Sequence, residues 1–205
     1  MFDAAARRML SGPLDRVAAV IDRRWVSPDR ITSLGLLLGL ACAGAAAAGR
    51  WTPALVLWLT SRLADGLDGP LARRRARRSE AAAPSAAGGF YDIAADFTVY
   101  GTTVVGVGLG TQDALWPFLA VLLAYYINGT AFLAFSSLAE RSGRRLDDGR
   151  SLSFIGGLAE GTETILVHAA WLIFPEQAGV LAAGWAAVVG VGAVHRIWLG
   201  YRLLR

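Results

Sequence analysis

The chain of 205 residues is strongly apolar, with 55% hydrophobic residues, a mean hydropathy of +0.45 and a formal net charge of +4. Its uncharged stretches are too long for the core helices of an ordinary soluble domain, so that class is excluded. We expect an all-α integral membrane protein, whose positive charge faces membrane lipids with anionic head groups rather than nucleic acid.

The first 26 residues alternate apolar and ionisable side chains at roughly helical spacing. This pattern is typical of an amphipathic helix that lies in the membrane interface. The segment has no continuous apolar region, so no cleavable signal peptide is expected. Ser27 and Pro28 suit the N-cap and first turn of the next helix. We therefore expect a cytoplasmic juxtamembrane helix over residues 1–26 and a transmembrane domain over residues 27–205.

Six stretches are long enough to cross a bilayer, which takes about 20 helical residues. The uncharged stretches are residues 31–48, 114–138 and 177–194. The stretches that contain charge are residues 51–71, 90–110 and 152–174. We expect six transmembrane helices after the interfacial helix.

The 20 basic residues are all arginine, and most of them gather before the first span, after the second, after the fourth and at the end of the sixth. By the positive-inside rule these segments are cytoplasmic. We therefore expect a multi-pass protein of the cell inner (plasma) membrane with both termini on the cytoplasmic side. The arginine-rich and then small-residue segment 73–89 predicts a loop between the second and third spans.

Four aspartates lie within stretches that we expect to cross the bilayer. Asp65 and Asp68 are spaced i, i+3 near the inner end of the second span, and Asp92 and Asp96 are spaced i, i+4 near the inner start of the third. Each pair therefore shares one helix face. Clustered carboxylates away from water must bind protons or cations, and hard oxygen ligands suit Mg²⁺ or Mn²⁺. We expect a metal site and a phosphate-containing substrate at the cytoplasmic end.

The neighbouring residues favour the same kind of site. Gly69 and Gly88 leave the backbone open to close approach, and Arg73 offers a planar donor fork that suits phosphate. One alternative is that the aspartates pair with Arg62 or Arg73 merely to hold helices together, as in an inactive structural protein. Another is a divalent-cation transporter, whose site would lie nearer the bilayer midplane.

The same residues carry a resemblance to a known family. The pattern D-x-x-D-G-x-x-A-R, a spacer and G-x-x-x-D-x-x-x-D is matched by Asp65, Asp68, Gly69, Ala72, Arg73, Gly88, Asp92 and Asp96. From residue 28 onward, in this pattern and in its six spans, the chain resembles the CDP-alcohol phosphotransferases. It departs from them in the longer spacer, residues 74–87, which we expect to be surface loop. It also has Asp29 where the family often has asparagine.

The resemblance implies transfer of a phosphatidyl group from a CDP-linked lipid donor, such as CDP-diacylglycerol, to a small alcohol acceptor, with release of CMP. Two divalent ions, Mg²⁺ or Mn²⁺, would be held by Asp65, Asp68 and Asp92, with Asp96 in contact. Asp96 would also take the proton of the acceptor hydroxyl as general base. The nucleotide contacts would come from Gly69, Ala72, Arg73, Gly88 and Thr32. A homodimer is implied as well.

The acceptor stays open at this point. Glu160 and Glu163 share a face of the fifth span. They either bind acceptor hydroxyls or pair with Arg62 or a loop arginine. The fourth and fifth spans contain no lysine or arginine, which disfavours a phosphorylated acceptor, although the loop between them is rich in arginine. We expect packing roles for Cys42 and His168.

Overall fold

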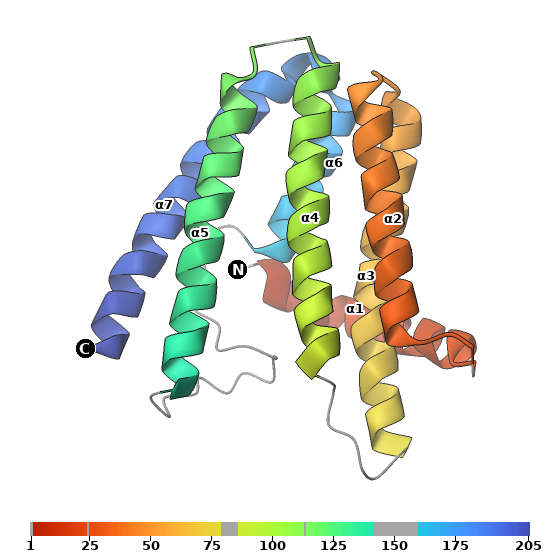
Figure 1. Cartoon of the computed structure of the whole chain (residues 1–205). Coiled ribbons are helices and arrows are strands. Elements are labelled where there is room, and N and C mark those ends of the chain that lie inside the picture. Colours follow the sequence, from red (N-terminus) through yellow and green to blue (C-terminus); the bar gives the residue numbers. More distant parts are fainter. Residues whose placement is uncertain (1, 24, 79–85, 113, 142–159) are drawn as a thin grey trace.

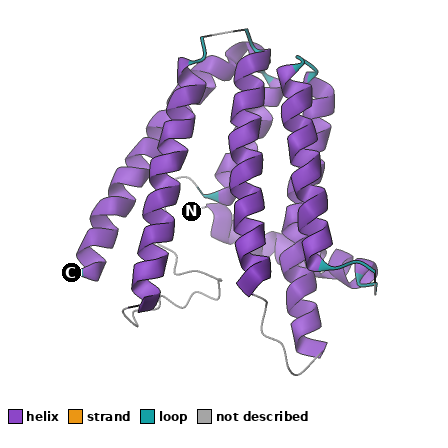
Figure 2. Cartoon of the chain, viewed as in Figure 1, coloured by secondary structure: helices purple, strands orange, loops and turns teal. Residues whose placement is uncertain are grey.

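The computed structural model describes residues 2–23, 25–78, 86–112, 114–141 and 160–205. Within these residues every regular element is a helix, as Figure 2 shows. The elements are α1 (Phe2–Ile21), α2 (Pro28–Ala47), α3 (Trp51–Arg78), α4 (Ala86–Gly110), α5 (Trp116–Arg141), α6 (Gly161–Ile173), the 3₁₀ turn η1 (Pro175–Gln177) and α7 (Ala178–Leu204). The all-α expectation is therefore confirmed for the described part of the chain.

The long helices run side by side, and α1 lies across one end of them (Figure 1). We refer to this end, where α7 also finishes, as the α1 end. Helix α2 packs on both α3 and α4, α5 packs on α7, and α6 contacts α3 and α7. Because α2 packs on both α3 and α4, its residues can contact side chains of either helix.

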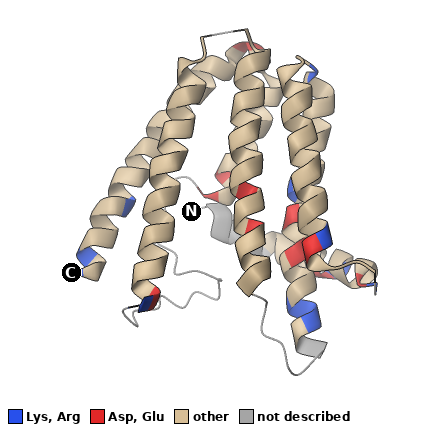
Figure 3. Ribbon diagram, in the orientation of Figure 1, with Lys and Arg blue, Asp and Glu red and all other residues tan. Residues whose placement is uncertain are grey.

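Four helical segments are long and apolar enough to cross a membrane: Pro28–Ala47, Ala86–Gly110, Trp116–Arg141 and Pro175–Leu204. Helix α3 is longer but charged toward its end, and the described part of α6 has 13 residues. Figure 3 shows that charge is sparse away from the α1 end. The count of six spans, and the location of α1 in the membrane interface, stay predictions.

The expected loop over residues 73–89 is wrong at both of its ends. Helix α3 continues through Arg78, and α4 begins at Ala86. Arginine and alanine are strong helix formers, and arginines at a helix C-terminus interact favourably with the helix dipole. The middle of the spacer, residues 79–85, lies outside the described residues, as do residues 152–159 of the expected fifth span.

Small residues bring α2 close to its two neighbours. A Cβ atom placed on Gly39 would overlap the side chain of Val99 on α4, and one placed on Gly106 of α4 would overlap the carbonyl oxygen of Ala43. On the α3 side, the carbonyl oxygen of Ser61 would lie 3.4 Å from a Cβ atom at Gly35. Such glycines allow helix backbones to approach closely in a membrane protein. They set the spacing of α3 and α4 across α2.

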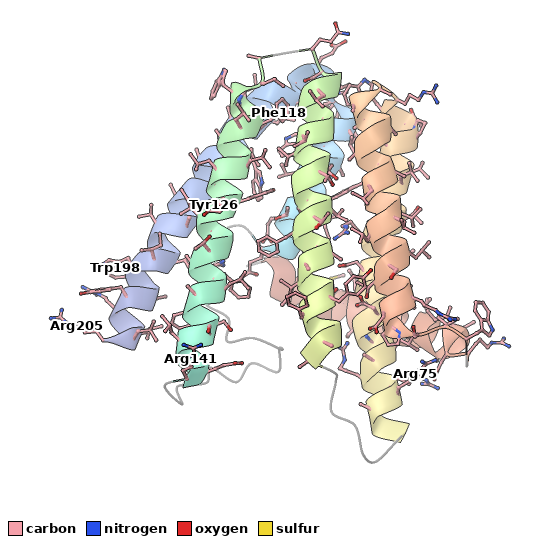
Figure 4. All side chains as sticks on the ribbon, in the orientation of Figure 1. Arg75, Phe118, Tyr126, Arg141, Trp198 and Arg205 are labelled. Atoms are coloured by element: carbon pink, nitrogen blue, oxygen red, sulfur yellow. The ribbon has the colours of Figure 1, made fainter. Side chains whose placement is uncertain are left out.

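Helix α1 is anchored to the charged end of α3. Leu14 and Ala18 join Leu67 in a small apolar cluster. Beyond the end of α1, the Asp22 carboxylate accepts hydrogen bonds from the Nε atoms of Arg74 at 3.2 Å and Arg75 at 3.1 Å. Figure 4 shows Arg75 beside this junction. The predicted cap of α2 is also present, since the Ser27 hydroxyl accepts from the backbone N–H of Arg30.

Candidate active site

The four aspartates come together between α3 and α4 in the α1 half of the bundle. Asp65 and Asp96 interact closely, and so do Asp68 and Asp92. Asp68 is 8% exposed, whereas the side chains of Asp65 and Asp96 keep 26% and 33% of their surface accessible. The spacing rule that paired them on two helix faces is confirmed, and the site is partly open.

Arg62 balances one of these pairs. Its Nη1 atom lies 2.6 Å from Oδ1 of Asp96 on the facing helix and 3.7 Å from Oδ1 of Asp65 one turn along its own helix. The side chain of Arg62 is 5% exposed. The spacing in sequence suggests the contact with Asp65, but the shorter bond to Asp96 depends on how α3 and α4 face each other.

Thr32 of α2 supports the other pair. Its hydroxyl donates to Oδ2 of Asp68 at 2.5 Å and also lies 3.2 Å from the carbonyl oxygen of Pro28. A hydrogen bond to an ionised group is stronger than a neutral one. Thr32 therefore orients a predicted metal ligand, and its expected contact with the nucleotide stays a prediction.

The residues expected to hold the nucleotide continue along the same two helices. A Cβ atom at Gly69 would lie 3.2 Å from Nη1 of Arg73, so the Arg73 guanidinium lies over the bare backbone of Gly69. Arg73 is exposed, and Ala72 beside it is partly buried. On α4, Gly88 is partly buried one turn before Asp92. These residues thus lie between the acidic cluster and the α1 end of the bundle.

One contact at this site was missed in the sequence. The hydroxyl groups of Ser33 on α2 and Tyr91 on α4 are hydrogen-bonded at 2.9 Å. Tyr91 directly precedes Asp92, and Ser33 directly follows Thr32. Each helix thus contributes a site residue and a neighbour that fixes its position relative to the other helix. A serine and a tyrosine give no sequence signal for such pairing, because it depends on the rotation of α2 against α4.

The donor set fits a divalent cation. The hydrogen-bond donors next to Asp68 are the Thr32 hydroxyl and the backbone N–H of Gly69, both of which are neutral. Two carboxylates in contact with neutral donors still need a cation or a proton between them. Within the described residues, however, no three Asp, Glu, His or Cys side chains converge closely enough to hold one ion. The expectation that the four aspartates bind a divalent ion therefore rests on the chemistry of their carboxylate oxygens, which suit Mg²⁺ or Mn²⁺.

Glu160, His168 and Cys42 lie outside the acidic cluster. Glu160 occupies the N-cap position of α6 without a capping bond from its side chain, and it interacts electrostatically with Arg196 of α7, a partner that the sequence does not indicate. His168 is fully buried, and its Nε2 atom is 2.9 Å from the hydroxyl of Tyr125. Cys42 is also buried. The packing roles of His168 and Cys42 are confirmed.

The sequence of residues 25–194 matches the family described as CDP-alcohol phosphatidyltransferase. The chain belongs to this family. It is accordingly a CDP-alcohol phosphotransferase, an enzyme that transfers substituted phosphate groups. The resemblance inferred from eight motif positions is confirmed.

Two relatives extend over nearly the whole chain. Inner membrane protein YnjF of Escherichia coli (strain K12) is 34% identical, over 100% of this chain and 98% of its own length. Archaetidylinositol phosphate synthase of Methanothermobacter thermautotrophicus is 29% identical, over 99% of this chain and 91% of its own. The name of the first relative agrees with the apolar helices seen here, so the phosphotransferase is a multi-pass membrane protein.

Solved structures support the fold. The Mycobacterium tuberculosis phosphatidylinositol phosphate synthase PgsA1, solved with CDP-DAG bound, superposes with a TM-score of 0.72 at 19% identity, covering 92% of this chain and 93% of its own. The same protein in complex with manganese and citrate gives a TM-score of 0.72 at 20% identity, covering 92% of this chain and 88% of its own. At these identities the likeness establishes the arrangement of helices.

Proposed function

We propose that this phosphotransferase makes a phospholipid by transferring a phosphatidyl group from a CDP-linked lipid donor, such as CDP-diacylglycerol, to the hydroxyl of a small alcohol, with release of CMP. The observation that carries the proposal is the gathering of the family motif between α3 and α4, where Asp65 lies next to Asp96 and Asp68 lies next to Asp92. The CDP-DAG and manganese named for the M. tuberculosis synthase support the same donor and a divalent ion.

The proposed roles follow from position. Arg73 and the bare backbone of Gly69 would receive the diphosphate, with Ala72 and Gly88 leaving room beside it. The aspartates would hold Mg²⁺ or Mn²⁺, which when bound neutralises the diphosphate and the charge that develops on the leaving CMP. Asp96 has a third of its side chain exposed, so it can reach the acceptor hydroxyl and remove its proton as the oxygen attacks the phosphorus atom.

The location of the site in the α1 half also supports a cytoplasmic reaction. The arginines in the last turns of α3 support a cytoplasmic location of this end by the positive-inside rule, and the nucleotide part of the donor is water-soluble. Its acyl chains would stay in the bilayer beside the helices. Both termini and the active site would then lie on the cytoplasmic side of the inner membrane.

The test is CMP release by the purified protein with CDP-diacylglycerol and Mg²⁺ or Mn²⁺. Inositol phosphate, glycerol 3-phosphate, inositol, serine and phosphatidylglycerol serve in turn as the acceptor. We expect release that depends on one acceptor and on the metal. Asp96→Asn keeps the size of the side chain but cannot act as a general base, so it should reduce turnover by about 100-fold or more.

Two outcomes would contradict parts of this proposal. Normal turnover by Asp96→Asn would remove Asp96 from the general-base role. No CMP release with any acceptor, together with metal uptake into vesicles that contain the protein, would favour the divalent-cation transporter instead. Size measurement in detergent would separately test the proposed homodimer.

A further inference from the structure

Arg62 occupies an unusually well-defined position for an arginine inside a membrane protein. Its Nη2 atom donates to the Ser61 hydroxyl at 3.0 Å, and that hydroxyl donates to the carbonyl oxygen of Gly35 on α2 at 2.7 Å. Its Nη1 atom is 2.6 Å from Asp96 on α4. A guanidinium has a fixed, planar set of donors, so these bonds on two sides fix its plane.

Two aromatic rings face the same guanidinium and a third packs against both; the three side chains are here termed the aromatic box. They are Trp58, Tyr100 and His168. The Cζ atom of Arg62 lies 5.3 Å from the ring centroid of Trp58 and 5.0 Å from that of Tyr100. Cations are attracted to aromatic faces at such distances. Arg62 therefore contacts rings from α3 and α4.

The aromatic box is itself rigid. The Trp58 and His168 rings are stacked with centroids 4.9 Å apart, and the Tyr100 ring meets the His168 ring edge-on at 5.6 Å. The indole N–H of Trp58 donates to the carbonyl oxygen of Ile165 at 3.1 Å, which ties the box to α6. Groups of α3 and α4 thus contact the cation directly, and α2 and α6 support those groups through Gly35 and Ile165.

Such an arrangement is more than helix packing requires. A buried ion pair usually contributes little net stability, because both charges lose their water. A general base, in contrast, needs a fixed orientation, and the Asp96 carboxylate is partly exposed and could otherwise rotate. Arg62 binds its Oδ1 atom and so restrains the orientation of the carboxylate that would meet the acceptor hydroxyl. The same cation also lies 3.7 Å from Asp65, where it would oppose the binding of a divalent ion.

We propose that Arg62 is a positioning residue: held by the aromatic box and Ser61, it orients the Asp96 carboxylate and closes the membrane-core side of the acidic site. The inference rests on the proposed transfer reaction. It predicts two opposite effects of removing the cation, because the orientation of the base is lost while electrostatic competition with the metal is relieved.

The experiment compares the full-length protein with Arg62→Met and Arg62→Lys. For each protein we would measure kcat for CMP release. We would also measure Mn²⁺ affinity, by titration calorimetry without substrate. We expect Arg62→Met to lower kcat by about 100-fold, the lower end of the range for general-base catalysis. It should bind Mn²⁺ about tenfold more tightly, because a neighbouring positive charge is gone. Arg62→Lys keeps the charge without the fork, so kcat should fall while Mn²⁺ affinity stays near that of the unchanged protein.

Two further variants separate positioning from loss of structure. Ser61→Ala removes the bond to Nη2 but keeps the guanidinium, and should lower kcat by about fivefold, as expected for the loss of one modest hydrogen bond. Arg196→Met removes another buried arginine, one that lies over Phe132 on α5, and should leave Mn²⁺ affinity unchanged. If Arg62→Met does not fold, Arg62→Lys and Ser61→Ala still decide the question.

The outcomes distinguish this inference from the proposed function. Transfer by the unchanged protein, with full kcat in folded Arg62→Met or Arg62→Lys, would overturn the positioning role and leave the transfer intact. Weaker Mn²⁺ binding by folded Arg62→Met would also overturn it, because a purely structural residue lowers kcat and metal affinity together. No transfer by the unchanged protein would overturn the proposed function first and this inference with it.

Discussion

The bond between Thr32 and Asp68 gives the sharpest test of how the site is supported. Thr32→Val removes the hydroxyl and keeps the branched shape, so α2 and its packing should be unaffected. The lost bond is a 2.5 Å contact to a carboxylate that is 8% exposed. Hydrogen bonds to charged groups contribute about 1.5–3 kcal/mol, and 1.36 kcal/mol corresponds to tenfold in rate. We therefore expect kcat/KM for the CDP-linked donor to fall by about 10- to 150-fold.

The assay is CMP release at several donor concentrations, with Thr32→Ser as the control. Serine keeps a hydroxyl at the same place and should recover most of the activity. Thermal unfolding of each variant checks that the bundle is unchanged. A Thr32→Val enzyme within about twofold of the unchanged protein would show that Asp68 needs no hydroxyl, since such a change is well below the value of one charged hydrogen bond.

Two predictions concern the scaffold around the site. Asp22→Asn should weaken the anchoring of α1 on α3 by about 1–3 kcal/mol, because the carboxylate has 6% of its side chain exposed and accepts from two arginines. Hydrogen exchange should then quicken over residues 2–21, and unchanged exchange there would contradict the anchoring. Gly106→Val should lower the thermal stability strongly, because its Cβ atom would overlap the carbonyl oxygen of Ala43. Gly101→Ala, where a Cβ atom meets nothing within 4 Å, is the control, and equal melting of the two variants would refute the close approach of α2 and α4.

Much of the fold could be predicted from the sequence because the strongest sequence patterns are local. The length of an apolar run compared with the thickness of a bilayer indicates a membrane helix without any knowledge of packing. The spacings of Asp65 with Asp68, and of Asp92 with Asp96, place each pair on one face of any α-helix. The cap formed by Ser27 and Pro28 is equally local. The resemblance to the family motif then indicated that the segments 65–73 and 88–96 belong to one site.

The errors in the sequence analysis also have a local cause. The arginine-rich and small-residue composition predicts a loop over residues 73–89, although arginine and alanine are good helix formers. Helix α3 continues to Arg78, and two arginines in its last turns have partners that no local pattern indicates. Arg74 and Arg75 bind Asp22, whose position depends on how α1 crosses the bundle.

The sequence by itself determined the all-α class, the four helices that are long and apolar enough to cross a membrane, and the two acidic faces, because each depends on residues within a few turns of one another. The tertiary structure decided which groups meet across helices. Arg62 bonds to Asp96 more closely than to Asp65 in its own helix, and Thr32 reaches Asp68 from α2. These contacts depend on the depth and rotation of each helix, which the glycines of α2 and α4 set through close packing. A periodic pattern fixes the face of a helix but leaves its partner and its depth undetermined.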